Sequence, residues 1–172
     1  MKLSDVQPQE YSQNNVRYLE KLPQDAELIK SFKDDFSAVL ELYQSMPSDK
    51  LDYRYAEGKW SLKEVFQHII DTERIFIYRC FRIARHDKTP LSGFDQDDYI
   101  WPSQADKKSL EALMEEFKAV RESSIVLLNS LNDANLKFIG IVNGNPLSAR
   151  AAAFNIIGHN KWHIDIIMER YL

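Results

Sequence analysis

Apolar residues recur at three- and four-residue steps in four long stretches of the chain, and this spacing predicts four amphipathic α-helices. The first stretch includes Leu28, Phe32 and Phe36 and ends before Pro47, which cannot continue a helix. The predicted helices cover residues 24–46, 61–86, 105–131 and 146–172. Helices of roughly 20 to 26 residues are about 30–40 Å long, a length typical of helix bundles.

The second predicted helix has the clearest start. Ser61 can cap the helix while the Glu64 side chain, three residues on, bonds back to the capping residue, which is the pattern of a capping box. Trp60 and Val65 can form the accompanying hydrophobic staple. The start of this helix is therefore predicted at Ser61.

The segments between the helices indicate how the bundle is connected. Residues 89–103 read as a long irregular connection that can cross an end of the bundle, so a simple up-and-down order is not required. A turn is predicted at 143–145, and Pro146 suits the first position of the fourth helix. Residues before Gln24 predict a short arm or extra helix. We therefore predict one all-α domain over residues 1–172, a four-helix bundle with room for one long crossover.

Composition narrows the class of protein. Of 172 residues, 44% are hydrophobic and 28% charged, values that argue against extensive disorder, and five glycines favour long regular elements. The net charge of −4 gives no general affinity for phosphate backbones, so no nucleic-acid partner is expected. No segment approaches the roughly 20 apolar residues of a membrane span, and no signal peptide is visible. With Cys80 as its single cysteine, the chain is expected to be cytoplasmic.

Two of the four histidines, His159 and His163, stand four residues apart in the last predicted helix. This spacing puts both imidazoles on one face, where they can reach one ion. They fall in the same arc as Ala152, Ile156 and Ile167, so the pair should face the bundle interior. Buried imidazoles need partners, and a metal ion supplies one for both. The alternative is a pair of hydrogen-bonded core histidines.

His68 is the candidate third ligand. It lies one to two turns into the second helix, and it meets His163 at the same end if those two helices are antiparallel. Its helical angle places it at the edge of the apolar stripe, which can still face a seam between helices. The remaining histidine, His86, stands at a predicted helix C-terminus, where a solvated cation is favourable, and is interpreted as structural.

Two motifs surround these histidines. They are Lys59-Trp60-Ser61 with Glu64, His68, Asp71 and Glu73, and Gly158-His159-Asn160-Lys161-Trp162-His163 with Glu169-Arg170-Tyr171-Leu172. These motifs resemble the DinB-like superfamily, which also contains the YfiT-like metal-dependent hydrolases and the bacillithiol and mycothiol S-transferases. The resemblance covers nearly the whole chain. It implies a four-helix bundle, a homodimer, and one divalent ion, Ni²⁺ or Zn²⁺ before others, held by His68, His159 and His163. Trp162 stands where relatives often carry a further histidine.

A site with three protein ligands leaves at least one coordination position for water or substrate. The ion can lower the pKa of bound water, polarise a carbonyl or stabilise a thiolate. The predicted function is therefore a metal-dependent hydrolase with a small-molecule substrate, or a transferase that uses a low-molecular-weight thiol. The alternative is a non-catalytic metal-binding protein, acting in stress response or interaction, whose ion secures the bundle.

Glu73 is the candidate general base, because it lies within about 20° of the centre of an otherwise apolar stripe. The alternative is an internal salt bridge with an arginine of a neighbouring helix. Asp71 and Glu64 are placed either to orient the His68 ring or to remain surface charges. A cationic stretch is interpreted either as a solvated face or as a site for an anionic substrate; it comprises Arg74, Arg79, Arg82 and Arg85.

Overall fold

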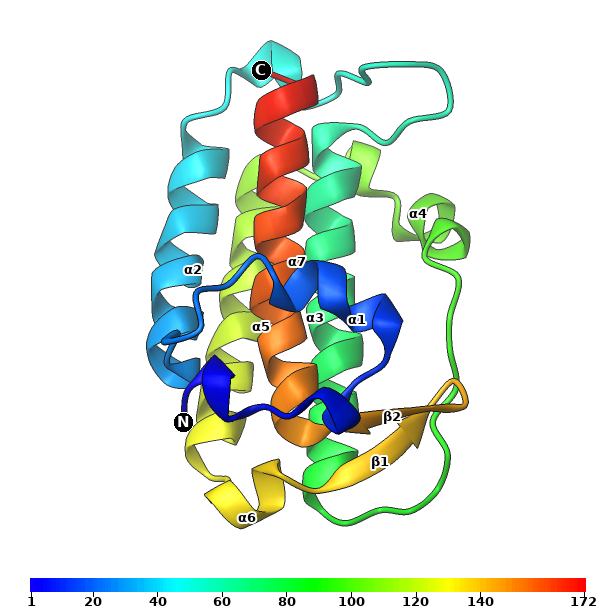
Figure 1. Ribbon diagram of the computed structural model, residues 1–172. Helices are drawn as coiled ribbons and strands as arrows, with labels where there is room; N and C mark the ends of the chain where they lie inside the picture. The colour runs from blue at the N-terminus through cyan, green and yellow to red at the C-terminus, as the bar shows by residue number, and fades with distance from the viewer.

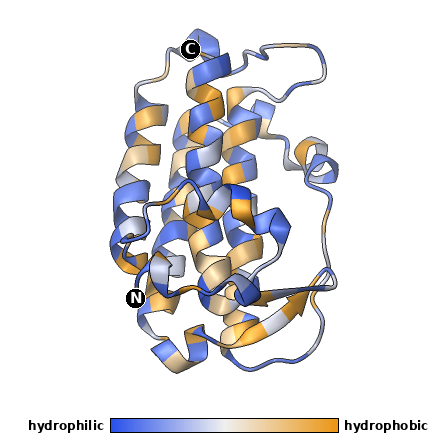
Figure 2. Ribbon diagram, in the orientation of Figure 1, coloured by the Kyte–Doolittle hydropathy of each residue, from blue (hydrophilic) through white to orange (hydrophobic).

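Four long helices form the body of the protein in the computed structural model, which describes residues 1–172 (Figure 1). They are α2 (Leu28–Gln44), α3 (Leu62–Ala84), α5 (Leu110–Asn129) and α7 (Ala149–Arg170). α3 packs against α5 and α7, and α2 packs against the same two helices, which gives the ring order α2–α5–α3–α7. Hydrophobic and hydrophilic residues alternate around these helices (Figure 2). The predicted four-helix bundle is confirmed.

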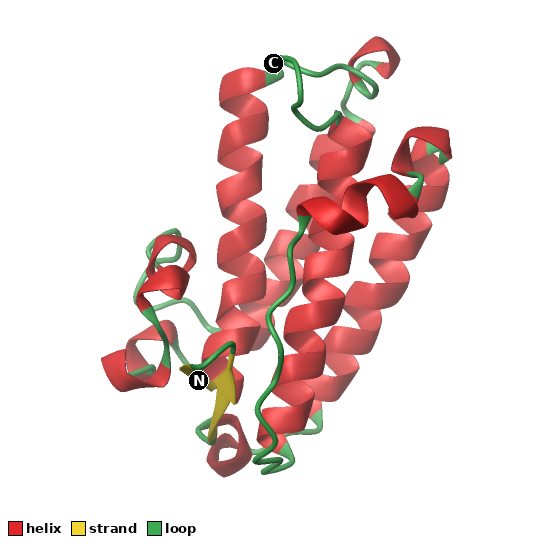
Figure 3. Cartoon of the chain, turned by 90° about the vertical axis from the view of Figure 1, so that its right-hand side faces the viewer, coloured by secondary structure: helices red, strands yellow, loops and turns green.

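The connection between α3 and α5 is the long crossover for which the sequence left room. α2 and α7 run in one direction, while α3 and α5 run in the other (Figure 1). The second and third long helices along the chain, α3 and α5, are therefore parallel. The chain from 85 to 109 therefore returns along the length of the bundle, which Figure 3 shows from the side. This connection contains a short helix, α4 (Asp97–Ser103), where the sequence predicted only irregular chain.

Serine caps define where three of the four long helices begin, namely α3, α5 and α7. The Ser61 hydroxyl accepts from the Glu64 backbone N–H at 3.3 Å, and the Glu64 carboxylate accepts from the Ser61 backbone N–H at 2.7 Å. The predicted capping box is thus confirmed. Ser109 and Ser148 cap α5 and α7 in the same way, at 3.1 and 3.0 Å. Each cap satisfies a backbone donor that has no partner inside its helix.

A β-hairpin precedes α7, and the prediction that α7 starts at Pro146 is wrong. β1 (Ile139–Val142) and β2 (Asn145–Ser148) are antiparallel, and Pro146 pairs with Ile141 in their register. Asn143 and Gly144 have φ of +48° and +75°, the left-handed conformations that a tight hairpin turn requires. The helix therefore begins three residues later than predicted, at Ala149.

The N-terminal segment folds against α7 as the predicted short helix. α1 (Gln13–Leu19) packs across α7 at Gly158 (Figure 1). A Cβ added at Gly158 would lie 2.1 Å from the Tyr18 carbonyl oxygen, so only glycine permits this approach. A further one-turn helix, α6 (Asp133–Leu136), precedes the hairpin. None of the helices combines the length and apolar character needed to cross a membrane.

Two clusters of buried apolar side chains are stacked along the bundle, with buried polar residues between them. On α2, Asp35 lies between Phe32 of one cluster and Val39 of the other. On α5, Arg121 lies between the clusters in the same way. The residues that form this polar layer are Asp35, Thr72, Glu73, Arg121, His159, Asn160 and His163. Every long helix contributes to it, so the layer spans the bundle.

Candidate metal centre

His68 of α3 converges with His159 and His163, the two histidines of the polar layer, which α7 carries. His159 Nε2 lies 2.9 Å from His68 Nε2 and 3.1 Å from His163 Nε2. One ring nitrogen from each residue lies within 4.8 Å of the others, and all three side chains are buried. α3 and α7 are antiparallel (Figure 1), and the Nε2 spacing places His68 at the level of His159. The structure thus brings together the three residues that the sequence proposed as ligands.

The donor set fits a divalent ion better than it fits a network of hydrogen bonds. A neutral imidazole donates from one nitrogen only, so His159 Nε2 cannot satisfy both neighbouring Nε2 atoms with one proton. A cation accepts a lone pair from all three. Two imidazole nitrogens that each lie about 2.0–2.1 Å from one ion are about 2.8–3.4 Å apart for right-angle to tetrahedral geometry. The observed nitrogen spacings of 2.9 and 3.1 Å lie in that range.

Burial keeps the three imidazoles in the form that binds metal. It lowers the pKa of His68 to about 4. Burial also lowers the pKa of His159 and of His163 well below the usual histidine range, and the neighbouring histidines add to the effect. All three rings are therefore neutral at neutral pH and present lone pairs rather than protons.

Aromatic side chains surround the histidine rings. Trp60 lies against His68 and Trp162 lies edge-on to His163, each with ring centroids 4.8 Å apart. Tyr18 of α1 lies edge-on to His159 at 5.2 Å. Trp162, the departure from the pattern of relatives, thus packs beside the candidate ligand His163 without replacing it. These rings shield the imidazoles from bulk water.

Thr72 is the residue that contacts the far side of the His68 ring. Its Oγ1 lies 3.5 Å from His68 Nδ1, one helical turn away. Asp71 is bonded to Gln67 and Arg74 instead. Sequence reasoning considered only acidic residues for this role and missed Thr72, although its four-residue spacing from His68 was visible.

Glu64 is engaged elsewhere as well. Its carboxylate pairs with Arg54 in addition to its place in the capping box. Neither acidic candidate for orienting His68 therefore contacts that ring.

Glu73 lies in a buried ion pair and makes no contact with the three histidines. Its carboxylate accepts from Arg121 Nε at 2.9 Å and from Arg121 Nη2 at 2.8 Å. Arg121 Nη1 donates to Asp35 at 2.9 Å, and Asn160 donates to the same Asp35 oxygen at 2.7 Å. These four residues, here named the charge cluster, join α3, α5, α2 and α7. The structure therefore gives Glu73 the salt bridge that the sequence left open as the alternative to a general base.

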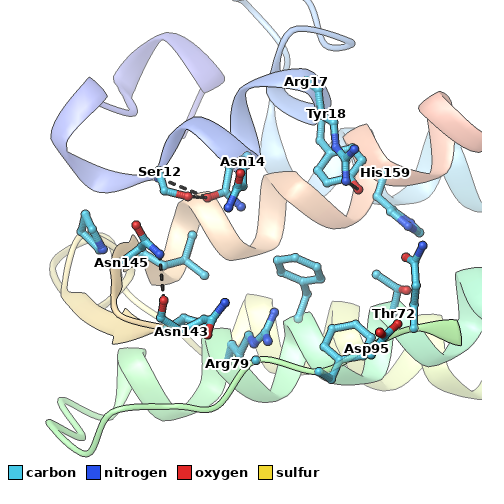
Figure 4. Close-up of a pocket in the computed structure, with 18 residues that line it drawn as sticks. Ser12, Asn14, Arg17, Tyr18, Thr72, Arg79, Asp95, Asn143, Asn145 and His159 are labelled. Carbon is cyan, nitrogen blue, oxygen red and sulfur yellow. Dashed lines mark hydrogen bonds between the residues drawn. The ribbon is translucent and has the colours of Figure 1, made fainter. Parts of the chain in front are cut away.

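A cavity of about 490 Å³ extends from His159 along the side of the bundle. Figure 4 shows His159 and Thr72 at one end and Asn143 and Asn145 at the other. Its outer wall is the crossover at residues 93–96, held to β1 by the Leu91 backbone, which bonds to Ile141 and Asn143 at 2.9 and 2.8 Å. A small molecule in this cavity would lie next to the histidine centre.

Cys80 and His86 lie outside the histidine centre. Cys80 is buried, and burial raises the pKa of its thiol to about 12, so it is an unreactive core residue. His86 is exposed, stacks on Phe138 at 4.3 Å and bonds to Asn135 at 3.1 Å. It contacts none of the other histidines, in agreement with a structural role.

The fold and the site together define a four-helix bundle with a candidate three-histidine metal centre. The model of the DinB superfamily matches residues 31–167, and the chain belongs to this superfamily. The resemblance found in the sequence motifs is thus confirmed over most of the chain.

Two individual proteins extend the comparison. A protein of Oceanobacillus iheyensis, named provisionally as a metal-dependent hydrolase, is 23% identical over 142 residues, or 80% of each chain. YfiT from Bacillus subtilis is described as a probable metal-dependent hydrolase with an unusual four-helix bundle topology. Its structure matches with a TM-score of 0.73 at 17% identity, covering 86% of this chain and 90% of YfiT. At this identity the likeness establishes the shared fold.

Proposed function

We propose that the chain is a metal-dependent hydrolase of a small molecule, with one Zn²⁺ or Ni²⁺ ion held by His68, His159 and His163. The observation that carries the proposal is the convergence of three buried Nε2 atoms around His159, which also lines the cavity. A cluster with no carboxylate, formed by imidazoles alone, suits these borderline ions rather than Ca²⁺ or Mg²⁺. The descriptions of both relatives as metal-dependent hydrolases support the same type of reaction.

The proposed roles of the residues follow from their contacts. An ion with three protein ligands supplies Lewis acidity and an acidified water. Thr72 fixes the orientation of the His68 ring through Nδ1, and Tyr18 covers the edge of His159. The charge cluster fixes all four helices at the level of the histidines. In this proposal Glu73 maintains the geometry of the site, since its oxygens are held by Arg121.

Metal content and turnover test the proposal together. Elemental analysis of purified protein should find about one divalent ion per chain, and His163→Ala should remove it. His86→Ala is the matched control, because His86 is exposed and contacts none of the three ligands. Metal-free wild-type protein with intact helix content, or equal loss in both variants, would contradict the ligand assignment.

Activity assays separate the hydrolase from the other functions. Cleavage of an ester or amide panel should stop with chelator and return with added metal. Metal-dependent consumption of a low-molecular-weight thiol without hydrolysis would instead support a thiol transferase. Bound metal that raises thermal stability without any turnover would support a non-catalytic protein. Sedimentation of the same samples tests the homodimer that the family resemblance implies.

A further inference from the structure

Arg79 is a buried cation in the wall of the cavity that also contains His159. The residue is 7% exposed, and none of the ion pairs of the chain includes it. Its one hydrogen bond runs from Nη2 to the Ser92 carbonyl oxygen at 3.1 Å. The rings of Phe76 and Phe94 lie 5.1 and 5.4 Å from the guanidinium carbon. Arg79 therefore lies in an aromatic setting with most of its five N–H donors free of protein acceptors.

The other buried arginines of the chain are paired. Arg121 binds Glu73 and Asp35, and Arg150 binds Glu10. Burying a guanidinium without a counter-charge is costly, and burial lowers the pKa of Arg79 accordingly. The chain thus supplies a carboxylate for each buried arginine except the one in the cavity wall.

The position of Arg79 on α3 connects it with the histidine centre. His68, Thr72, Phe76 and Arg79 follow one another at four-, four- and three-residue steps, so they share one face of the helix. Thr72, Phe76 and Arg79 all line the cavity, and Figure 4 shows Arg79 nearer Asn143 than Thr72 is. At about 1.5 Å of rise per residue, Arg79 lies roughly 10 Å beyond Thr72 along the helix.

We infer that the substrate is an elongated small molecule that carries a carboxylate or phosphate group bound by Arg79, with its reacting bond toward His159. Phe76 contacts the apolar middle of such a molecule, and Asn143 and Asn145 offer neutral donors at the anionic end. Asp95 is the single acidic residue of the lining; it is exposed and accepts from the Asp97 backbone N–H at 3.0 Å. The orientation toward His159 rests on the proposed function, whereas the anion site does not.

The anion site is tested on the chelator-treated protein, so that the metal cannot bind the probe. Inorganic phosphate and acetate are titrated separately while the Arg79 Nε–H resonance is followed by NMR. At least one of them should bind to wild-type protein, and binding should weaken about ten- to hundredfold in Arg79→Gln. Arg79→Lys should retain part of the affinity, since lysine keeps the positive charge but lacks the paired N–H donors of the guanidinium. Phosphate or acetate preference identifies which anionic group the site takes.

Arg85→Gln is the matched control, because Arg85 immediately follows α3, is exposed and lies outside the cavity. It should bind the probes as wild type does. Helix content by circular dichroism and metal content must be unchanged in Arg79→Gln. Absence of binding to wild-type protein, or equal binding to Arg79→Gln with its fold intact, would overturn the inference.

A second titration tests the orientation in metal-loaded protein. Suberic acid monohydroxamate carries a metal-binding head and a distal carboxylate, and octanoyl hydroxamate lacks the carboxylate. The first should bind at least tenfold more tightly, and the difference should vanish in Arg79→Gln. Equal affinity of the two probes for wild-type protein would overturn the orientation. Anion binding retained by His163→Ala, together with metal-free wild type, would support the anion site while refuting the proposed function.

Discussion

The charge cluster and the histidine centre lie at neighbouring positions of the same bundle, and they solve the burial of polar groups differently. In the charge cluster, Arg121 forms ion pairs with both Glu73 and Asp35. Only one Asp35 oxygen and the Asn160 carbonyl oxygen lack a partner there. In the histidine centre, three neutral nitrogens face one another, and His159 Nδ1 also has no partner. We expect the charge cluster, whose buried groups pair with one another, to stabilise the fold. We expect the histidine centre, whose buried nitrogens cannot all pair with one another, to bind a ligand.

The largest predicted effect concerns the charge cluster. Arg121→Met should lower the free energy of unfolding by about 3–5 kcal/mol, because it leaves Glu73 and Asp35 buried without a counter-charge. Chemical denaturation measures the change. Adding Glu73→Gln and Asp35→Asn to the same protein should recover much of the loss, since no unpaired charge remains. A loss below about 1 kcal/mol for the single variant would show that the cluster contributes no more than a surface pair.

The contribution of the histidine centre to stability should depend on bound metal rather than on hydrogen bonds among the histidines. In a hundredfold excess of Zn²⁺ or Ni²⁺ over the dissociation constant, the free energy of unfolding of wild-type protein should rise by about 3 kcal/mol. His159→Ala should abolish this gain, because His159 is the ring between the other two. Thermal unfolding with and without metal measures both. An undiminished gain in His159→Ala would place the ion elsewhere.

Gly158→Ala should affect the histidine centre more than the charge cluster. The new Cβ would meet the Tyr18 backbone, so α1 must move away from α7 and uncover His159. We expect a loss of about 1–3 kcal/mol in unfolding free energy and a severalfold weaker affinity for metal. Alanine is otherwise the better helix former, so a gain in stability would mean that α1 does not press against α7.

The smallest effect is expected for Glu116, a partly exposed counterpart of the charge cluster. Burial raises the pKa of Glu116, but hydrogen bonds from Lys108, Arg74 and Gln67 outweigh it and lower the pKa to about 2. The folded pKa lies below the ordinary value of 4.5, so this stabilisation is complete above pH 4.5 and is lost as the pH falls toward 2. Glu116→Gln should cost about 1 kcal/mol at pH 7, because solvent screens the pairs. Urea unfolding between pH 7 and pH 2 should show the free-energy difference between wild type and Glu116→Gln disappearing at low pH. A difference that stays constant with pH would show that it does not come from the charge of Glu116.

The parts of the fold that depend on local sequence could be predicted. The capping box at Ser61 placed the start of α3, and helical spacing placed His159 and His163 on one inward face. The hairpin was missed because Pro146 also suits a helix start, and its strands are only four residues long. The Asn143-Gly144 pair, a strong hairpin signal, was sufficient to find it.

Long-range partners were the part that local patterns could not supply. The sequence indicated that a buried Glu73 needs an arginine on a neighbouring helix, but helical spacing cannot tell which arginine faces it. The same limit applies to the arginines of α3. In the sequence they form one cationic stretch with nothing to tell them apart. Only the fold shows that Arg79 is buried without a carboxylate, while Arg74 and Arg82 are paired.

The crossover has a consequence for how proteins of this fold can diversify. Residues 93–96 form the outer wall of the cavity, yet they belong to neither apolar cluster and to none of the helices that carry the histidines. Replacements in such a segment change which molecules fit while leaving the bundle and its centre intact. Selectivity can therefore evolve, or be engineered by randomising 94–96, separately from the proposed metal chemistry of the histidine centre.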